Sequence, residues 1–226
     1  KKFPKLNKFL KRYHQERMVA EKVRYNGEIY TRRVLYTAQL FADKAGNYKI
    51  DPITLKVQYY PNRSNSYSNL GIGLGLRRQM SGTITSQPIQ ITVKKLPVDS
   101  MPPHFTGLVG KHEFKLTQNK NKFLVNDPIE LKFSVKGSGA LELFESPNFL
   151  DNPSIEEFDS NSDLTVSNDF TATKTFNITH LGRGAVEIPG ARLPLSYFDT
   201  VTQKYITEYV ELKPIVVAGS GQYVPS

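Results

Sequence analysis

The feature that most constrains the fold is a repeated alternation of apolar and polar residues in short segments separated by turn residues. In 89–93, for example, Ile89, Ile91 and Val93 alternate with Gln90 and Thr92. Successive side chains of a strand point to opposite faces, so this period of two indicates half-buried β-strands. Asn26-Gly27 separates two such segments and favours a two-residue hairpin turn. No helical stripe accompanies these patterns, and the sequence therefore predicts an all-β fold.

Turn residues divide the chain into segments of roughly 8–12 residues, a spacing typical of β-sandwiches. The opening residues 1–17 are predicted as a helical turn or a loop, and residues 61–82 as a long loop without periodicity. Alternating or apolar residues predict strands at 19–25, 29–40, 48–50, 53–59, 89–93, 112–116, 123–125, 129–135, 141–144, 164–166, 171–178, 185–188, 193–197 and 205–217.

A proline-rich segment from Leu96-Pro97 to Pro102-Pro103 is predicted as a linker. We expect tandem immunoglobulin-like β-sandwich domains at 1–96 and 97–218, followed by a tail at 219–226. The segment from Gly46 to Leu55 is echoed by that from Gly184 to Leu193, which indicates duplication. Because the first half has fewer predicted strands, we expect it to lack strands upstream of Lys1 and to expose a sheet edge or an open core.

The absence of cysteine excludes disulfides, thiolate metal sites and a cysteine nucleophile. Aromatic residues make up 11% of the chain, which favours a folded core over disorder. The sequence has neither a signal peptide nor an apolar run of membrane-spanning length. Since it begins at Lys1 rather than Met, we expect it to be part of a longer protein.

The formal net charge of +9 is unevenly distributed. Residues 1–33 are rich in Lys and Arg, whereas residues 142–169 are acidic. This distribution indicates either two domains of different surface charge or a basic face for anionic lipid or an acidic protein. Nucleic acid is disfavoured as a partner, because no nucleic-acid-binding motif is present.

The sequence shows no catalytic or metal-binding constellation. Its histidines are not spaced with carboxylates as metal ligands usually are; they are His14, His104, His112 and His180. Composition alone leaves a Ser-His-Asp triad open, but the Gly-x-Ser-x-Gly elbow is missing. We therefore expect no enzyme activity, no catalytic residues, no bound metal and no cofactor.

The Gly71-x-Gly73-x-Gly75 segment lacks the Gly-Lys-Ser/Thr ending of a phosphate-binding loop. It is interpreted as a flexible loop or as a partner-docking loop. The docking interpretation assigns partner binding to Leu74, Leu76, Arg77 and Arg78, since arginine is a favoured interface anchor.

An acidic stretch is predicted as a loop; it carries Asp151, Glu156, Glu157, Asp159 and Asp163. Its acids do not follow the order of a calcium-binding EF-hand loop. The two interpretations are a solvated loop and a partner-binding surface that uses Glu156 or Asp159.

Several runs together suggest a family. They are 85–97, which continues into 103–110, then Asn126-Asp127-Pro128-Ile129, Gly137-Ser138-Gly139, Ile188-Pro189 and Leu195-Ser196-Tyr197-Phe198-Asp199. The first run resembles the inter-domain junction of BatD-type proteins of the bacterial Bat (aerotolerance) family, and the later runs fit the same family. The resemblance covers most of the chain, although the Gly- and Ser-rich loop at 61–82 departs from the aromatic-rich loop expected there.

The resemblance implies a periplasmic protein with serial immunoglobulin-like domains, a signal peptide and a C-terminal membrane anchor, the last two lying outside this sequence. It implies von Willebrand factor A-type and TPR-type Bat partners, a link to oxygen or oxidative-stress tolerance, and no catalytic residues. The expected function is thus a non-enzymatic, extracytoplasmic scaffold or adaptor. A metal ion held by a von Willebrand factor A-type partner could accept a carboxylate from Glu156 or Asp159.

The alternative is a carbohydrate- or peptidoglycan-binding module. Tyr25, Tyr30 and Tyr36 could form a sugar platform, although the lack of Trp counts against one. A glycan-array signal would favour this alternative.

Overall fold

The computed structural model describes residues 6–14, 20–34, 37–59 and 79–219. Within these ranges the regular elements are β-strands and one 3₁₀ turn, Leu141–Leu143, which confirms the predicted all-β class. The same ranges contain no helix with the length and apolar character needed to cross a membrane. The chain forms two compact units, one of residues 1–10 with 42–95 and one of residues 11–41 with 96–226.

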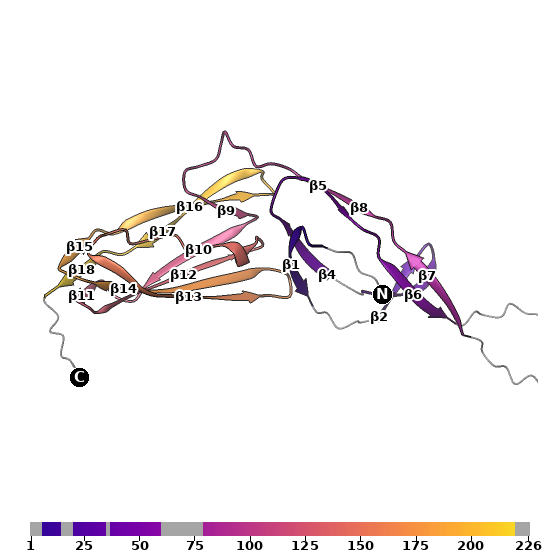
Figure 1. Cartoon of the computed structure of the whole chain (residues 1–226), viewed down its shortest axis with the longest axis horizontal. Coiled ribbons are helices and arrows are strands. Elements are labelled where there is room, and N and C mark those ends of the chain that lie inside the picture. The colour runs from indigo at the N-terminus through magenta and orange to yellow at the C-terminus, as the bar shows by residue number, and fades with distance from the viewer. Residues whose placement is uncertain (1–5, 15–19, 35–36, 60–78, 220–226) are drawn as a thin grey trace, which may run out of the picture. The chain divides into compact units, whose positions relative to one another are not determined.

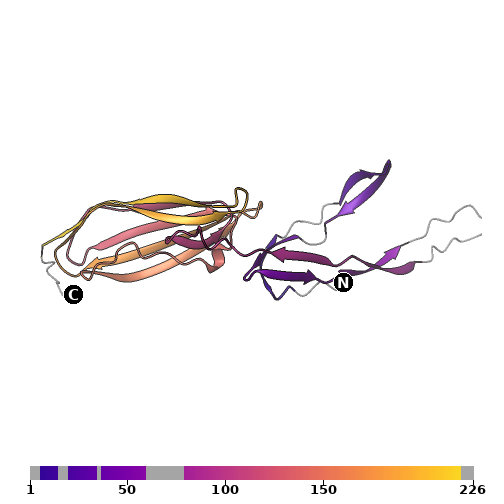
Figure 2. The same cartoon turned by 90° about the horizontal axis from the view of Figure 1, so that it is seen from above.

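The second unit contains two sandwich-like layers (Figures 1 and 2). The first is an antiparallel sheet in the order β10 (His112–Gln118), β12 (Pro128–Gly137), β14 (Ala172–Gly182), β13 (Ile155–Val166). The other layer holds β17 (Lys204–Leu212), β16 (Ala191–Asp199) and β9 (Phe105–Val109), together with β11 (Lys122–Leu124), β18 (Ile215–Ala218) and β15 (Val186–Ile188). The pairs β9–β16 and β11–β18 are parallel, and the others are antiparallel.

The core of this unit lies between the layers. On β12, Ile129, Leu131, Phe133 and Val135 are almost completely buried, whereas most of the residues between them are exposed. They join one cluster with buried side chains of the opposite layer, including Leu195, Tyr197, Val210, Ile215 and Val217. The period-two pattern of the sequence thus corresponds directly to which face of β12 is buried.

Residues 11–41 form two strand pairs. β1 (Phe9–His14) pairs with β4 (Thr37–Ala42), and β2 (Ala20–Tyr25) pairs with β3 (Glu28–Arg33). At the tip of the second pair, Asn26 has φ 48° and Gly27 has φ 84°. These positive values at both central residues confirm the predicted Asn-Gly hairpin.

The first unit is built on one long hairpin with a break on both strands. β5 (Gly46–Ile50) pairs with β8 (Ile89–Val93), and β6 (Thr54–Tyr59) pairs with β7 (Met80–Thr85). Ile50 faces Ile89 before the break, and Thr54 faces Thr85 after it. Equal numbers of residues are therefore skipped on the two strands, and one register runs through the whole hairpin.

The second unit repeats this arrangement with β15–β18 before the break and β16–β17 after it. Here Ile188 faces Ile215, and Ala191 faces Leu212. Pro189 and Pro214 lie in the break, as Pro52 and Pro88 do in the first unit. A proline cannot donate to a strand ladder, so each hairpin is interrupted where its prolines lie.

The two hairpins also match in their apolar pairs. When the breaks are aligned, Ile50–Ile89 corresponds to Ile188–Ile215, Leu55–Ile84 to Leu193–Val210, and Tyr59–Met80 to Tyr197–Ile206. Ile215 is fully buried, whereas Ile89 in the first unit is 57% exposed. Of the two matching faces, only the one in the second unit is covered by a second layer among the described residues.

Four sequence-based expectations about local structure are wrong. The predicted strand 205–217 is interrupted, since β17 ends at Leu212 and β18 begins at Ile215. The opening segment contains the strand β1, and the run from Leu141 to Phe144 forms a 3₁₀ turn. In that turn both Leu141 and Phe144 are buried. Residues three apart lie on one side of a 3₁₀ helix, so this short apolar run fits a helical turn as well as a strand. The predicted strand 29–40 is not continuous, since β3 ends at Arg33 and β4 begins at Thr37.

β7 and β9 escaped prediction completely, and β13 was predicted only at residues 164–166. The acidic stretch is not a loop, because residues 155–166 form β13. This strand lies at the edge of its sheet and is exposed along most of its length, so burial imposes no apolar alternation on it. β7 contains Gly82 and only two large apolar residues, which gave a weak strand signal.

The predicted linker at 96–103 contains no strand and lies between β8 and β9. The two compact units divide between Lys95 and Leu96, but the second unit also includes residues 11–41. The assignment of 1–96 and 97–218 to separate domains stays a prediction, and residues 220–226 of the predicted tail lie outside the described ranges.

We predict that Phe133→Ala lowers the free energy of unfolding by about 3–5 kcal/mol, since it removes a completely buried ring from the centre of the core. Urea unfolding followed by tyrosine fluorescence measures this change. Phe158→Ala is the matched control: this ring is 67% exposed, so the change should stay within about 0.5 kcal/mol. Equal losses in the two variants would contradict the described core.

Candidate functional site

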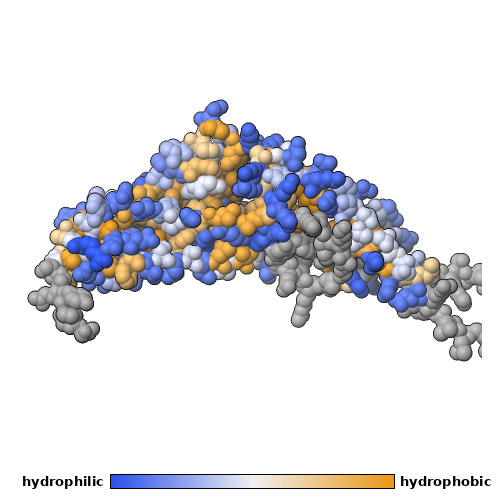
Figure 3. Space-filling model, in the orientation of Figure 1, coloured by the Kyte–Doolittle hydropathy of each residue, from blue (hydrophilic) through white to orange (hydrophobic). Residues whose placement is uncertain are grey.

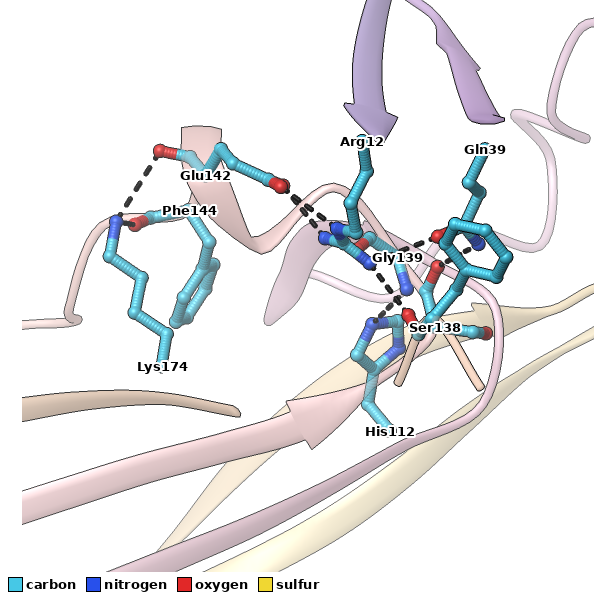
Figure 4. Close-up of polar contacts among 9 residues, drawn as sticks. Arg12, Gln39, His112, Ser138, Gly139, Glu142, Phe144 and Lys174 are labelled. Carbon is cyan, nitrogen blue, oxygen red and sulfur yellow. Dashed lines mark hydrogen bonds and ion pairs between the residues drawn. The ribbon is translucent and has the colours of Figure 1, made fainter. Parts of the chain in front are cut away.

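The most connected polar cluster of the second unit is centred on Arg12 of β1 (Figure 4). Its guanidinium binds both carboxylate oxygens of Glu142, with Nε–Oε1 2.9 Å and Nη2–Oε2 2.8 Å. It also donates to the carbonyl oxygens of Gly139 at 3.0 Å and Phe170 at 2.8 Å, and to the Gln39 side chain at 3.0 Å. All five N–H groups of a guanidinium have a fixed fork geometry, so this arrangement fixes the side chain firmly.

The Arg12 side chain is 3% exposed and that of Glu142 is 24% exposed. Burial raises the pKa of the Glu142 carboxyl, but the hydrogen bonds and positive charge of Arg12 outweigh burial, so its pKa lies below the usual value. The Arg12 guanidinium also lies 4.9 Å from the centre of the Phe41 ring. Arg12 thus ties the β1–β4 pair to the turn after β12, within a single compact unit.

The His112 ring contacts the same turn. Its Nδ1 lies 2.9 Å from the Gly110 carbonyl oxygen, and its Nε2 accepts the Gly139 N–H at 3.3 Å. These contacts require a neutral ring with the proton on Nδ1. A Cβ at Gly137 or Gly139 would collide with the His112 ring at 2.3 or 2.6 Å, which explains why the Gly137-Ser138-Gly139 turn uses glycine at both positions.

A hollow of about 280 Å³ adjoins this cluster; it is lined by Lys111, His112, Glu113, Lys136, Gly137, Ser138 and Thr171. Its size lies just below the range of typical small-molecule pockets. His112 has both ring nitrogens engaged with backbone groups, so it cannot act as a base toward Ser138. The hollow therefore offers two lysines and one glutamate, but no paired nucleophile and base.

The two predicted acidic residues, Glu156 and Asp159, lie on β13. Glu156 is paired with Arg183, whose Nε lies 2.6 Å from its carboxylate. No hydrogen bond or ion pair of the Asp159 side chain is found among the described residues. Between them the register of β13 shifts, and the shift exposes Phe158. Sequence analysis missed the exposed Phe158 ring beside the unpaired Asp159. An apolar residue in a strand is usually assigned to the core, and the bulge at Phe158 is visible only in the structure.

The β2–β3 pair forms an exposed ribbon with two different faces. Directly opposed residues share a face, so Val23, Tyr25 and Tyr30 lie together on one side. Tyr25 is 66% and Tyr30 52% exposed, and their rings meet edge to face at 6.2 Å. The other side carries Lys22, Arg24 and Arg33. We call these two sides the aromatic face and the basic face of the ribbon.

Other predicted residues lie outside the described ranges: Leu74, Leu76, Arg77, Arg78 and Tyr36. Their proposed roles stay predictions. Within the described ranges, no three His, Asp or Glu side chains converge on a common point where a metal ion could bind.

Comparisons with known proteins add no assignment. No family model, no curated protein and no solved structure matches this chain.

We predict that Arg12→Ala lowers the free energy of unfolding by about 2–3 kcal/mol, because it leaves Glu142 and two carbonyl groups without their partner. Arg32→Ala, which breaks the exposed Arg32–Glu21 pair, should cost less than about 1 kcal/mol. Thermal and urea unfolding of both variants measure the difference. A neutral effect of Arg12→Ala would show that the pair adds nothing to stability.

We also predict a loss of stability as the pH falls below about 6.5. Burial lowers the pKa of His112 below its usual value, although its bond to Gly110 acts in the opposite direction. Burial likewise lowers the pKa of His180, against the charge of Glu157. The unfolded chain thus binds more protons than the folded chain in this range, so acid favours unfolding. The free energy of unfolding is therefore retained at pH values above the histidine pKa of the unfolded chain. It decreases as the pH falls from that value toward the lower pKa of the folded chain.

Urea unfolding at pH 7.5 and pH 5 tests this dependence. His112→Gln should be less stable than the wild type at pH 7.5 but should lose less stability on acidification. His104→Gln changes an exposed side chain and should leave the pH dependence intact. An unchanged pH dependence in both His112→Gln and His180→Gln would contradict the assignment.

Proposed function

We propose that this chain is a non-enzymatic extracytoplasmic scaffold or adaptor, which binds partner proteins in a bacterial envelope complex linked to aerotolerance or oxidative stress. The proposed partners are Bat-type envelope proteins of the von Willebrand factor A and TPR types. The observation that carries the proposal is the aromatic face of the β2–β3 ribbon, which is exposed and has the composition of a protein interface.

A two-stranded ribbon in water has little stability of its own, because it buries almost no apolar surface. Tyr25 and Tyr30 nevertheless lie exposed on it. Tyrosine is among the residues that contribute most to binding energy at protein interfaces, since it combines a large apolar ring with a polar group. A ribbon with this composition is suited to insertion against a partner.

The proposal includes a tandem of immunoglobulin-like sandwiches. It is supported by the matching broken hairpins of the two units, which share their pairing pattern, their paired apolar positions and their prolines. In this interpretation the exposed apolar face of β5–β8 corresponds to the face of β15–β18 that packs in the sandwich core. Serial copies of one module would suit a spacer that holds partners at fixed separations.

A second contact could involve the metal ion of a von Willebrand factor A-type partner. Such an ion needs an exposed carboxylate that is free to coordinate it. Of the two acids singled out in the sequence, Asp159 fits better than Glu156, because Glu156 already pairs with Arg183. The exposed Phe158 beside Asp159 would add apolar contact area.

Carbohydrate or peptidoglycan binding is the second candidate function, and the exposed tyrosines of the aromatic face favour it. However, Tyr25 and Tyr30 meet at an interplanar angle of 73°. Sugar rings stack flat on aromatic faces, and two nearly perpendicular rings do not make one continuous platform. We therefore place protein binding first.

A pull-down from detergent-solubilised envelopes of the bacterium that encodes this chain tests the proposal. The wild-type chain as bait should recover a von Willebrand factor A-type membrane protein, and Tyr25→Ala/Tyr30→Ala should reduce recovery about tenfold or more, as expected when two interface anchors are lost. Tyr209→Ala is the matched control, because Tyr209 is exposed to a similar degree on β17.

The same experiment in EDTA tests the metal-bridged contact. EDTA should lower recovery with the wild-type bait, and Asp159→Ala should lower it to the same level and remove its sensitivity to EDTA. Recovery of glycan without protein would instead support the second candidate function. If the Tyr25→Ala/Tyr30→Ala bait recovers as much partner as the wild type, the aromatic face is not the binding surface.

A further inference from the structure

The basic face of the β2–β3 ribbon carries a row of cations without any acid. Its residues, in opposed pairs, are Arg33 with Ala20, Lys22 with Thr31, and Arg24 with Ile29. The acids of the ribbon lie on the aromatic face instead, where Glu21 is already paired with Arg32. Lys22, Arg24 and Arg33 are all exposed, so this row has no compensating charge within the ribbon.

The outer face of β13 carries the opposite charge. Phe176 and Ile178 of β14 are buried, so the residues opposite them on β13, Ser162 and Ser160, lie on the core side of the sheet, although at this edge they are exposed. The intervening residues point outward, and among these are Asp159, Asn161 and Asp163, which lie opposite Thr179, Asn177 and Thr175. The neighbouring outward-facing residues of β14 are therefore uncharged. On β13 itself, Asp159 and Asp163 are exposed.

The two rows match in spacing. Asp159 and Asp163 are four residues apart on one strand, which corresponds to about 13 Å. Along the strand direction, Arg24 and Arg33 are separated by the same distance, since Arg33 lies opposite Ala20, four residues from Arg24; Arg33 is also offset sideways by about 5 Å, because it lies on the neighbouring strand. Lys22 lies midway between the two arginines, as Asn161 does between the two aspartates. An arginine can thus meet each aspartate while Lys22 meets the Asn161 side-chain oxygen.

Both elements also have unpaired backbone edges within the described part of the chain. β13 is the last strand of its four-stranded sheet, and β2 and β3 pair only with each other. Long exposed edge strands tend to pair with other chains unless charge prevents it. An acidic edge repels another acidic edge but attracts a basic ribbon, so the charge selects the partner.

We propose that the basic face of the β2–β3 ribbon in one copy of this chain docks on the acidic outer face of β13 in a second copy. The chain would then associate with itself through the Arg24–Lys22–Arg33 row and the Asp159–Asn161–Asp163 row. This contact leaves the aromatic face free for another partner, but it occupies Asp159 and therefore competes with the metal-bridged contact proposed above. Exposed ion pairs are individually weak, so the association is weak and sensitive to salt.

Sedimentation velocity of the whole 226-residue chain at low salt tests the proposal. The wild type should show a sedimentation coefficient that rises with protein concentration, and 0.5 M NaCl should weaken association by about tenfold or more. Two charge-reversal variants should stay monomeric: Lys22→Glu/Arg24→Glu/Arg33→Glu and Asp159→Lys/Asp163→Lys. An equimolar mixture of these variants should associate again, because each variant keeps the wild-type row that the other has lost and the two reversed rows also complement each other.

Controls separate this contact from a general effect of net charge. Lys120→Glu/Lys122→Glu/Lys213→Glu changes the net charge as much as the basic-face variant does, at other exposed positions, and should associate like the wild type. Tyr25→Ala/Tyr30→Ala should also self-associate normally, which distinguishes this contact from the proposed partner site. Unfolding curves confirm that each variant is folded.

Three outcomes would overturn the proposal. The first is a wild type that stays monomeric at every concentration. The second is a mixture of the two reversed variants that does not associate. The third is a monomeric wild type that binds vesicles containing anionic phosphatidylglycerol but not phosphatidylcholine, with binding lost in the basic-face variant; the basic face would then be a lipid-binding surface.

Discussion

Four inward-facing side chains of β12 set the architecture of the second unit. Ile129, Leu131, Phe133 and Val135 lie between the two layers, and β12 pairs with a strand on each side. This strand positions its neighbours: β10 and β14 are hydrogen-bonded to it, and β16–β18 pack against it across the core. Because side chains alternate, a shift of one residue would turn all four toward solvent, so burial fixes the register of the whole sheet.

The Arg12 cluster extends this order to the edge of the sandwich. The turn after β12 must bring its carbonyl groups to the guanidinium while the His112 ring fills the space beneath it, and only glycine at 137 and 139 permits both. Burying a charge is unfavourable unless its partners are complete, and here the partners come from β4, the turn after β12, the 3₁₀ segment and the turn between β13 and β14. Such a network has one arrangement in which all its groups are satisfied, which favours a single position for the β1–β4 pair.

Sequence analysis predicted the parts of the fold that local chemistry determines. The Asn26-Gly27 hairpin and the core strands follow from turn preference and alternation, and both are present. Most of β13 was missed, because a strand with little burial has no apolar pattern to reveal it. β1 was missed because its most buried described side chain is the charged Arg12. The Arg12 cluster was also missed: Arg12 is 130 residues from Glu142, so no local spacing could connect them. Glu156 and Asp159 were recognised as surface acids, but the pairing of Glu156 with Arg183, 27 residues away, could not be read from local spacing.

The broken hairpins have a consequence for how such a chain can change in length. Each break skips equal numbers of residues on its two strands, three in the first unit and two in the second. A single inserted residue on one side would shift the cross-strand pairing of everything beyond it, whereas matched insertions on both sides would preserve that pairing. Among chains descended from one ancestral hairpin, changes of length would thus be tolerated freely at the tip. Within a break they would be tolerated only where both strands change by the same number of residues.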